Sequence, residues 1–141
     1  MNLTRKQVLH KFFEKGFVKE RKKFPQVIDC TYVRITKTLG IKCFYDSRLR
    51  NIIFKRQKKF AKLHLAPKAY YSFNLEGNLL SDNELYCYVT QHAKLLSNIS
   101  DENPNYIKLD KELKKHKFDT DDLHYRNIGK INGKLVCIDF G

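Results

Sequence analysis

The chain of 141 residues contains no tryptophan and no long apolar run. A membrane-spanning helix needs about 20 predominantly apolar residues in succession, and no segment of this sequence approaches that length. The first 17 residues mix charges with apolar side chains, so they lack the uninterrupted apolar region of a secretory signal. With 42% hydrophobic and 13% aromatic residues, the sequence favours one cytoplasmic domain with a moderate core.

The cysteines lack the close spacing of a metal or redox motif. Cys30, Cys43, Cys87 and Cys137 are widely separated, and no two of them form a C-x-x-C pair. The last three lie in apolar, strand-like runs, where a free thiol behaves as a small hydrophobic side chain. We therefore expect reduced cysteines in the core rather than zinc ligands or disulfides.

Acidic residues are scarce. The chain has 28 Lys and Arg residues against 15 Asp and Glu residues, a net charge of +13, and it has no acidic residue between Asp46 and Glu76. Such a charge attracts nucleic acid, a membrane surface, an acidic protein or the phosphates of ATP, and it does not select among them.

The pattern of apolar residues predicts an α+β fold in three segments. Residues 1–24 read as a basic helical segment, in which Thr4 caps a helix that extends towards Lys23 and Gly16 offers a stop signal. Residues 25–90 read in the order strand, strand, helix, strand, strand, and residues 91–141 as two short helices and a hairpin. The expected strands cover residues 27–35, 40–45, 68–74 and 84–90, with helices over 46–67, 91–98 and 106–117.

The C-terminal hairpin has a strong turn signal. Two β-prone runs, Asn127–Ile131 and Lys134–Phe140, flank the dipeptide Asn132-Gly133. This dipeptide suits the two positive φ angles of a type I′ turn, so we expect a tight antiparallel pair.

Three residues around this hairpin have the spacing of a phosphoryl-transfer site. Asp122 and Asn127 are five residues apart, as in the D-x-x-x-x-N catalytic loop of kinases. Phosphoryl transfer needs a carboxylate near the acceptor hydroxyl and oxygen ligands for Mg²⁺. Because the hairpin reverses the chain, we expect Asp139 to reach the same metal ion as Asn127.

In this order, D-L-H-x-x-N, hairpin and D-F-G, the sequence resembles the protein-kinase-like superfamily. The His after D-L resembles the motif of aminoglycoside phosphotransferases. The Ala-Pro-Lys-x-Tyr segment at Ala66–Tyr70 resembles a segment of short kinase-like proteins of bacteriophages. The resemblance spans about Pro25 to Gly141 and is specific over Asp122–Gly141. It implies a kinase-like N-lobe, a small antiparallel sheet with one helix, and a C-lobe truncated after D-F-G.

The resemblance also implies roles for individual residues and two cofactors, ATP and Mg²⁺. Asp122 would be the catalytic base, while Asn127 and Asp139 would be metal ligands. A lysine on the second strand, Lys42, would hold the α- and β-phosphates, with an exposed strand lysine as the equal alternative. The adenine would meet backbone groups of the strand that ends near the hinge, at Tyr88, Thr90 and Gln91.

Several features depart from the kinase pattern. The expected phosphate-covering loop, Asp29–Leu39, contains no glycine, although backbone N–H groups approach phosphates most closely where glycines are present. The helix after Lys42 has no Glu to orient that lysine. Ile53 stands near the expected position, and Gln57 one turn later is a polar substitute.

The sequence therefore leaves three functions open. The first is a small kinase-like protein that binds ATP–Mg²⁺, with phosphate transfer undecided. The second is an inactive, pseudokinase-type module that binds and modulates a host protein, in the host cytoplasm if a phage encodes it. The third is a basic protein that binds nucleic acid or an acidic partner. In this interpretation the hairpin lacks the C-lobe helices that it would normally pack against. The N-terminal helix, or a second chain in a homodimer, would pack against it instead.

Overall fold

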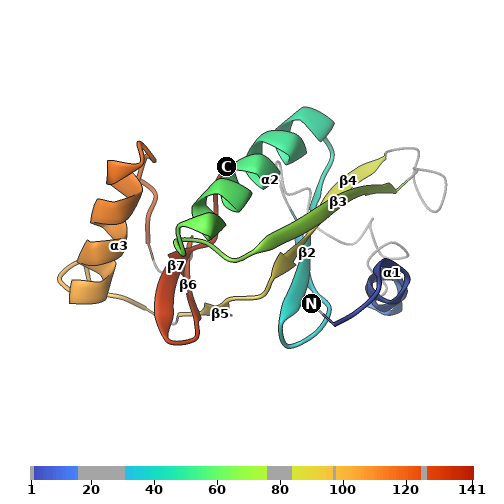
Figure 1. The fold of residues 1–141 in the computed structure, drawn as a ribbon, viewed down its shortest axis with the longest axis horizontal. Helices are drawn as coiled ribbons and strands as arrows, with labels where there is room; N and C mark the ends of the chain where they lie inside the picture. Colours follow the sequence, from blue (N-terminus) through green and yellow to red (C-terminus); the bar gives the residue numbers. More distant parts are fainter. Residues whose placement is uncertain (1, 16–30, 76–83, 97, 125–126) are drawn as a thin grey trace. The chain divides into compact units, whose positions relative to one another are not determined.

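The computed structural model describes residues 2–15, 31–75, 84–96, 98–124 and 127–141. Within these ranges it has three helices and two antiparallel sheets, which confirms the α+β prediction (Figure 1). The helices are α1 (Arg5–Glu14), α2 (Ser47–Lys62) and α3 (Pro104–Lys115). The strands are β1 (Thr31–Arg34), β2 (Leu39–Phe44), β3 (Ala69–Leu75), β4 (Leu85–Gln91), β5 (Lys94–Leu95), β6 (Ile128–Ile131) and β7 (Lys134–Cys137).

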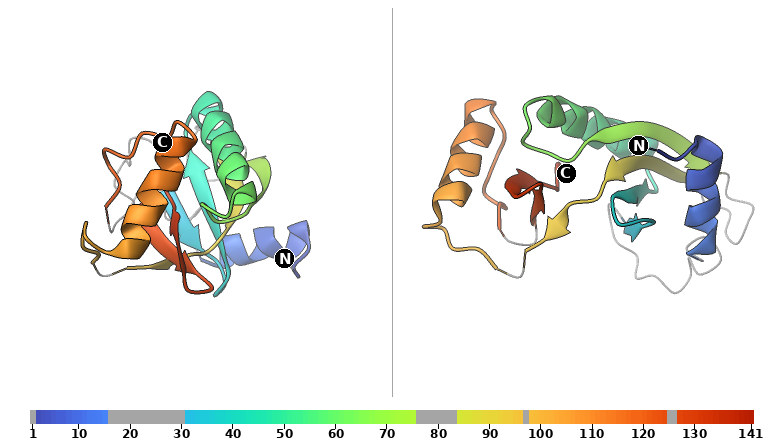
Figure 2. Two further views of the ribbon diagram at one scale, coloured as in Figure 1. Left: turned by 60° about the vertical axis from the view of Figure 1, so that its left-hand side comes forward. Right: turned by 60° about the horizontal axis from the view of Figure 1, so that its bottom comes forward.

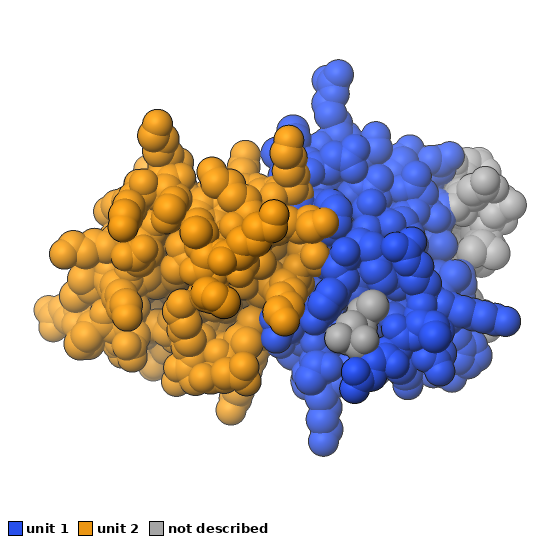
Figure 3. Space-filling model, in the orientation of Figure 1, with its two compact units in different colours: residues 1–54, 70–92 blue, residues 55–69, 93–141 orange. Residues whose placement is uncertain are grey.

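The chain divides into two compact units, which are coloured separately in Figure 3. Unit 1 comprises Met1–Phe54 and Tyr70–His92, and unit 2 comprises Lys55–Ala69 and Ala93–Gly141. The division falls within α2, so each unit contains one part of that helix.

Unit 1 is built on a four-stranded sheet in the order β1-β2-β4-β3. Helix α1 covers one face of it, with Val8 and Phe12 almost fully buried against the sheet. Thr4 caps α1 as expected, because its hydroxyl accepts the Gln7 N–H while the Gln7 side chain accepts the Thr4 N–H. The expected stop at Gly16 and the continuation to Lys23 lie outside the described residues.

Helix α2 begins where the sequence predicts and ends earlier. The Asp46 carboxylate accepts the N–H groups of Arg48 and Leu49, which satisfies two donors that have no partner within the helix. The helix ends at Lys62 rather than at Pro67, because His64 adopts φ 60 and donates its N–H to Ala61 O at 3.0 Å. A left-handed residue closes a helix without a proline.

Unit 2 contains the three-stranded sheet β5-β6-β7, with α3 against β7 (Figure 2). The prediction of a helix over 91–98 is wrong, since β4 continues to Gln91 and Lys94–Leu95 pair with β6. The segment lies close to β6: a Cβ on Gly129 would lie 2.7 Å from the Ala93 Cβ and 3.2 Å from the Lys94 carbonyl oxygen. A glycine in a strand often marks such a close approach.

The hairpin prediction is confirmed. Strands β6 and β7 pair antiparallel, and the turn residues Asn132 and Gly133 have φ angles of 51° and 80°. Both angles are in the left-handed region that a type I′ turn requires.

The cysteine prediction is confirmed for the described positions, because Cys43, Cys87 and Cys137 are free and buried. Cys30 lies outside the described residues. In the described ranges, no helix combines the length and the apolar character that a membrane crossing requires.

Candidate functional site

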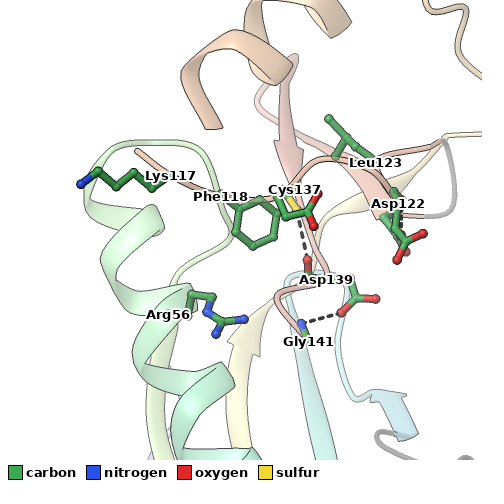
Figure 4. Close-up of a pocket in the computed structure, with 10 residues that line it drawn as sticks. Arg56, Lys117, Phe118, Asp122, Leu123, Cys137, Asp139 and Gly141 are labelled. Carbon is green, nitrogen blue, oxygen red and sulfur yellow. Dashed lines mark hydrogen bonds between the residues drawn. The ribbon is translucent and has the colours of Figure 1, made fainter. Parts of the chain in front are cut away.

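A pocket of about 320 Å³ in unit 2 brings together the three residues predicted from the catalytic-loop spacing (Figure 4). Asp122, Asn127 and Asp139 all line it. The other lining residues are Arg56, Lys117, Phe118, Asp119, Leu123, Cys137 and Gly141. The pocket thus carries three carboxylates, two cations and one amide.

Asn127 holds the parts of this pocket together. Its side-chain Nδ2 donates to the main-chain carbonyl of Asp122, five positions earlier, at 2.7 Å. Its own carbonyl accepts the Ile138 N–H at 2.9 Å, which fixes the residue next to Asp139. The side-chain Nδ2 is used in the loop, so the Oδ1 atom is the part of the amide available to a ligand.

The loop that carries Asp122 is anchored from α3. The Tyr106 hydroxyl donates to Leu123 O at 3.0 Å, and the Leu123 N–H donates to Thr120 O at 2.9 Å. Leu123 is buried while its neighbour Asp122 is exposed. Leu123 therefore anchors the loop, and Asp122 just before it presents a carboxylate to solvent.

Asp139 lies beside the well-anchored Phe140. The Arg56 Nη1 donates to Phe140 O at 2.6 Å, and Phe140 has no exposed surface. One Asp139 carboxylate oxygen accepts the Gly141 N–H at 3.0 Å, as Figure 4 shows. Asp139 is itself exposed, so its carboxylate is held at one oxygen and is accessible to solvent.

With so few oxygen ligands, the pocket would suit Mg²⁺ only if the ion arrived on a phosphate ligand, and not as an all-protein cage. Mg²⁺ bound with nucleotides uses one or two carboxylates, keeps several waters and takes its other ligands from the phosphates. Asp139 and the Asn127 amide oxygen would supply such a partial set. Among the described residues, no group of three or more His, Cys, Asp or Glu side chains could hold a metal.

The residues predicted to bind the nucleotide lie together on one face of the unit 1 sheet. Lys42 on β2 is directly opposite Tyr88 on β4, and Gly40 is opposite Thr90 in the next row. Directly paired residues point to the same face of a sheet. The Lys42 Nζ lies 5.7 Å from the centre of the Tyr88 ring. Tyr88 and Thr90 are both buried, and the Phe54 ring of α2 packs against the Tyr88 ring with centres 5.1 Å apart.

The loop between β1 and β2 is closed on itself. The N–H groups of Ile35 and Thr36 donate to Leu39 O, and those of Thr38 and Leu39 donate to the Thr36 hydroxyl. The Arg34 guanidinium adds bonds to the carbonyls of Thr36 and Lys37. A phosphate cradle needs backbone N–H groups that point at the ligand. This loop uses them internally, which agrees with its lack of glycine.

A tyrosine–histidine pair that no sequence pattern indicates lies on the same face. The Tyr32 hydroxyl and His92 Nδ1 are 2.5 Å apart, and their rings stack with centres 5.7 Å apart. Burial raises the pKa of Tyr32 to about 12, against a smaller opposite effect of Arg34. Burial, followed by the Arg34 charge, lowers the pKa of His92. Near neutral pH the phenol is therefore the donor and the neutral imidazole the acceptor.

This pair makes a testable prediction for alkaline pH. A phenol whose pKa is higher in the folded than in the unfolded chain stabilises the fold below the unfolded value of about 10. That contribution is lost as pH rises from about 10 to about 12. We expect Tyr32→Phe to lose less stability than wild type across this window. Urea unfolding at several pH values measures the difference, and equal slopes for both proteins would contradict it.

Comparison of the chain with protein-family models, with curated proteins and with solved structures gives no match. The geometry of the site is therefore the basis for a proposed function. Arg56 and the Tyr32–His92 pair are the functional candidates that sequence reasoning missed. Their partners are 84 and 60 residues away along the chain, and no local pattern marks such contacts.

Proposed function

We propose that this protein is a small kinase-like protein that binds ATP together with Mg²⁺. The observation that carries the proposal is the Asn127 amide, which bonds the Asp122 carbonyl while Asn127, Asp122 and Asp139 line one pocket. The order of strands and helix in unit 1 and the hairpin in unit 2 support the same interpretation.

Each residue has a distinct task in this proposal. The Asn127 Oδ1 and the Asp139 carboxylate hold Mg²⁺, which neutralises charge on the phosphates. Arg56 and Lys117 add positive charge at the pocket wall. Asp122 is exposed and orients an acceptor hydroxyl if transfer occurs. The roles predicted for Lys42, on the phosphates, and for the end of β4, on the base, concern unit 1 and stay predictions.

Calorimetry of ATP binding with and without Mg²⁺ tests the proposal. We expect wild type to bind ATP more tightly with Mg²⁺ and Asp139→Ala to lose that gain, because a carboxylate ligand has been removed. Asp101→Ala removes an exposed carboxylate that lies outside this pocket and is the matched control. Absence of ATP–Mg²⁺ binding by wild type would sink the proposal.

The closed β1–β2 loop favours a second candidate, a kinase-like module that binds a partner without transferring phosphate. Four of its backbone N–H groups are bonded within the loop, so these four do not help to stabilise charge on a transferring phosphoryl group. This candidate predicts ATP binding without turnover. Release of phosphate that Asp122→Ala abolishes would decide for an enzyme, and equal release by both proteins would decide for a binding module.

A further inference from the structure

The Tyr32 ring does not lie over its own row of the sheet. Tyr32 on β1 is directly opposite Lys42, yet its hydroxyl reaches His92, which follows the end of β4. To do so the ring crosses strand β2 beside Lys42. A Cβ on Gly40 would overlap the Tyr32 phenol, so the ring lies on the surface of that glycine.

Gly40 is a glycine for reasons of space. It lies within strand β2 and is not among the residues with a positive φ, so its backbone does not demand glycine. It is nevertheless buried, because the phenol covers it. Removing the Tyr32 ring would leave a flat slot over Gly40, with His92 Nδ1 at its end and Lys42 two residues along the strand.

The slot has the chemistry of a site for a planar, hydrogen-bonding ring. Its floor accepts an aromatic ring, and His92 Nδ1 accepts a hydrogen bond from the occupant's donor. Gly40 and Lys42 are about 7 Å apart along the strand. A base over Gly40 would thus have the lysine beside it for attached phosphates. A purine with an exocyclic amine supplies the planar ring and the hydrogen-bond donor, and its nucleotide also supplies the phosphates.

We propose that Tyr32 is a self-inhibitory plug, which closes this slot until the Tyr32–His92 hydrogen bond opens and a purine base takes the place of the phenol. Tyr32 is still 41% exposed, so the ring can swing outward without disturbing the core. The closed ring competes with the base, and the apparent affinity falls by the fraction of molecules that are open. The identity of the base rests on the proposed ATP binding, whereas the plug is a property of unit 1.

Calorimetry with adenosine, which lacks phosphates and needs no metal, tests the plug on the full chain. We expect Tyr32→Ala to bind adenosine about 10-fold tighter than wild type, because no closed state competes. Tyr32→Phe keeps the ring and loses the bond to His92, so its affinity should lie between the two. Tyr45→Ala removes another exposed tyrosine, one that lies outside strands β1 and β2, and should leave the affinity unchanged.

Folded Tyr32→Ala with unchanged or weaker adenosine affinity would overturn the plug. The double variant Tyr32→Ala with Gly40→Val should lose the gain, since a branched side chain refills the slot. Nitrogen NMR of His92 in wild type provides a measurement that needs no variant. The Nδ1 signal should move on adenosine addition, and a fixed signal at saturation would also overturn the plug.

The same data separate the plug from the proposed function. If Tyr32→Ala gains adenosine affinity while wild type and variant both show no Mg²⁺-dependent ATP binding, the plug stands and the ATP–Mg²⁺ proposal fails. If wild type binds ATP–Mg²⁺ and Tyr32→Ala gains no adenosine affinity, the ATP–Mg²⁺ proposal stands and the plug fails. Asp139→Ala should change the Mg²⁺ dependence of ATP binding without changing adenosine binding.

Discussion

Phe140→Ala is expected to lower the free energy of unfolding by about 3–5 kcal/mol, the usual cost of deleting a buried phenylalanine side chain. Phe140 has no exposed surface, stacks on Phe60 with ring centres 5.4 Å apart and packs against the tilted ring of Phe118 at 5.3 Å. These three rings join α2, the segment after α3 and the chain beyond β7 in unit 2. Urea unfolding followed by far-ultraviolet circular dichroism measures the loss, since the chain has no tryptophan to report it.

Two further variants make this prediction specific. Leu95→Ala shortens an apolar side chain that is 60% exposed and should change stability by less than about 0.5 kcal/mol. Phe140→Leu keeps most of the apolar volume and should lose clearly less than Phe140→Ala. A loss below about 1 kcal/mol for Phe140→Ala would contradict the aromatic cluster seen here. Because Phe140 adjoins Asp139, the same variant should also weaken ATP–Mg²⁺ binding.

The elements that could be predicted from the sequence are those with a local signal. Thr4 caps α1, Asp46 starts α2, and the Asn132-Gly133 dipeptide turns the last hairpin. Each depends on residues within a few positions of one another, which a single sequence displays. The strand at Lys94–Leu95 could not be found in this way, because it pairs with β6, which lies far along the chain.

The same distinction applies to the candidate site. Asp122, Asn127 and Asp139 share a pocket as their spacing predicts, since one loop and one hairpin connect them. Arg56 enters the pocket from α2 and binds the Phe140 carbonyl across 84 residues of sequence. Nothing in a run of basic residues shows which one faces the site. The role of Lys42 stays a prediction that nucleotide binding by Lys42→Met would test.

Arg50→Met is expected to lower the free energy of unfolding by about 2–4 kcal/mol, because two backbone carbonyls would lose a charged donor. Arg50 is 6% exposed, and its Nη1 donates to Phe73 O at 3.1 Å and to Cys87 O at 2.9 Å. One guanidinium thus ties the first turns of α2 to strands β3 and β4. Burial lowers the pKa of Arg50, against smaller opposite effects of Cys87 and Tyr86.

Arg48→Met tests whether this effect belongs to the position rather than to the loss of a positive charge from α2. Arg48 is exposed on the same helix, so its replacement should cost less than about 0.5 kcal/mol. Arg50→Lys keeps the charge but places it on a shorter side chain without the planar guanidinium, and its stability should lie between those of Arg50→Met and wild type. Equal losses for Arg48→Met and Arg50→Met would mean that net charge, and not the carbonyl clamp, sets the stability of unit 1.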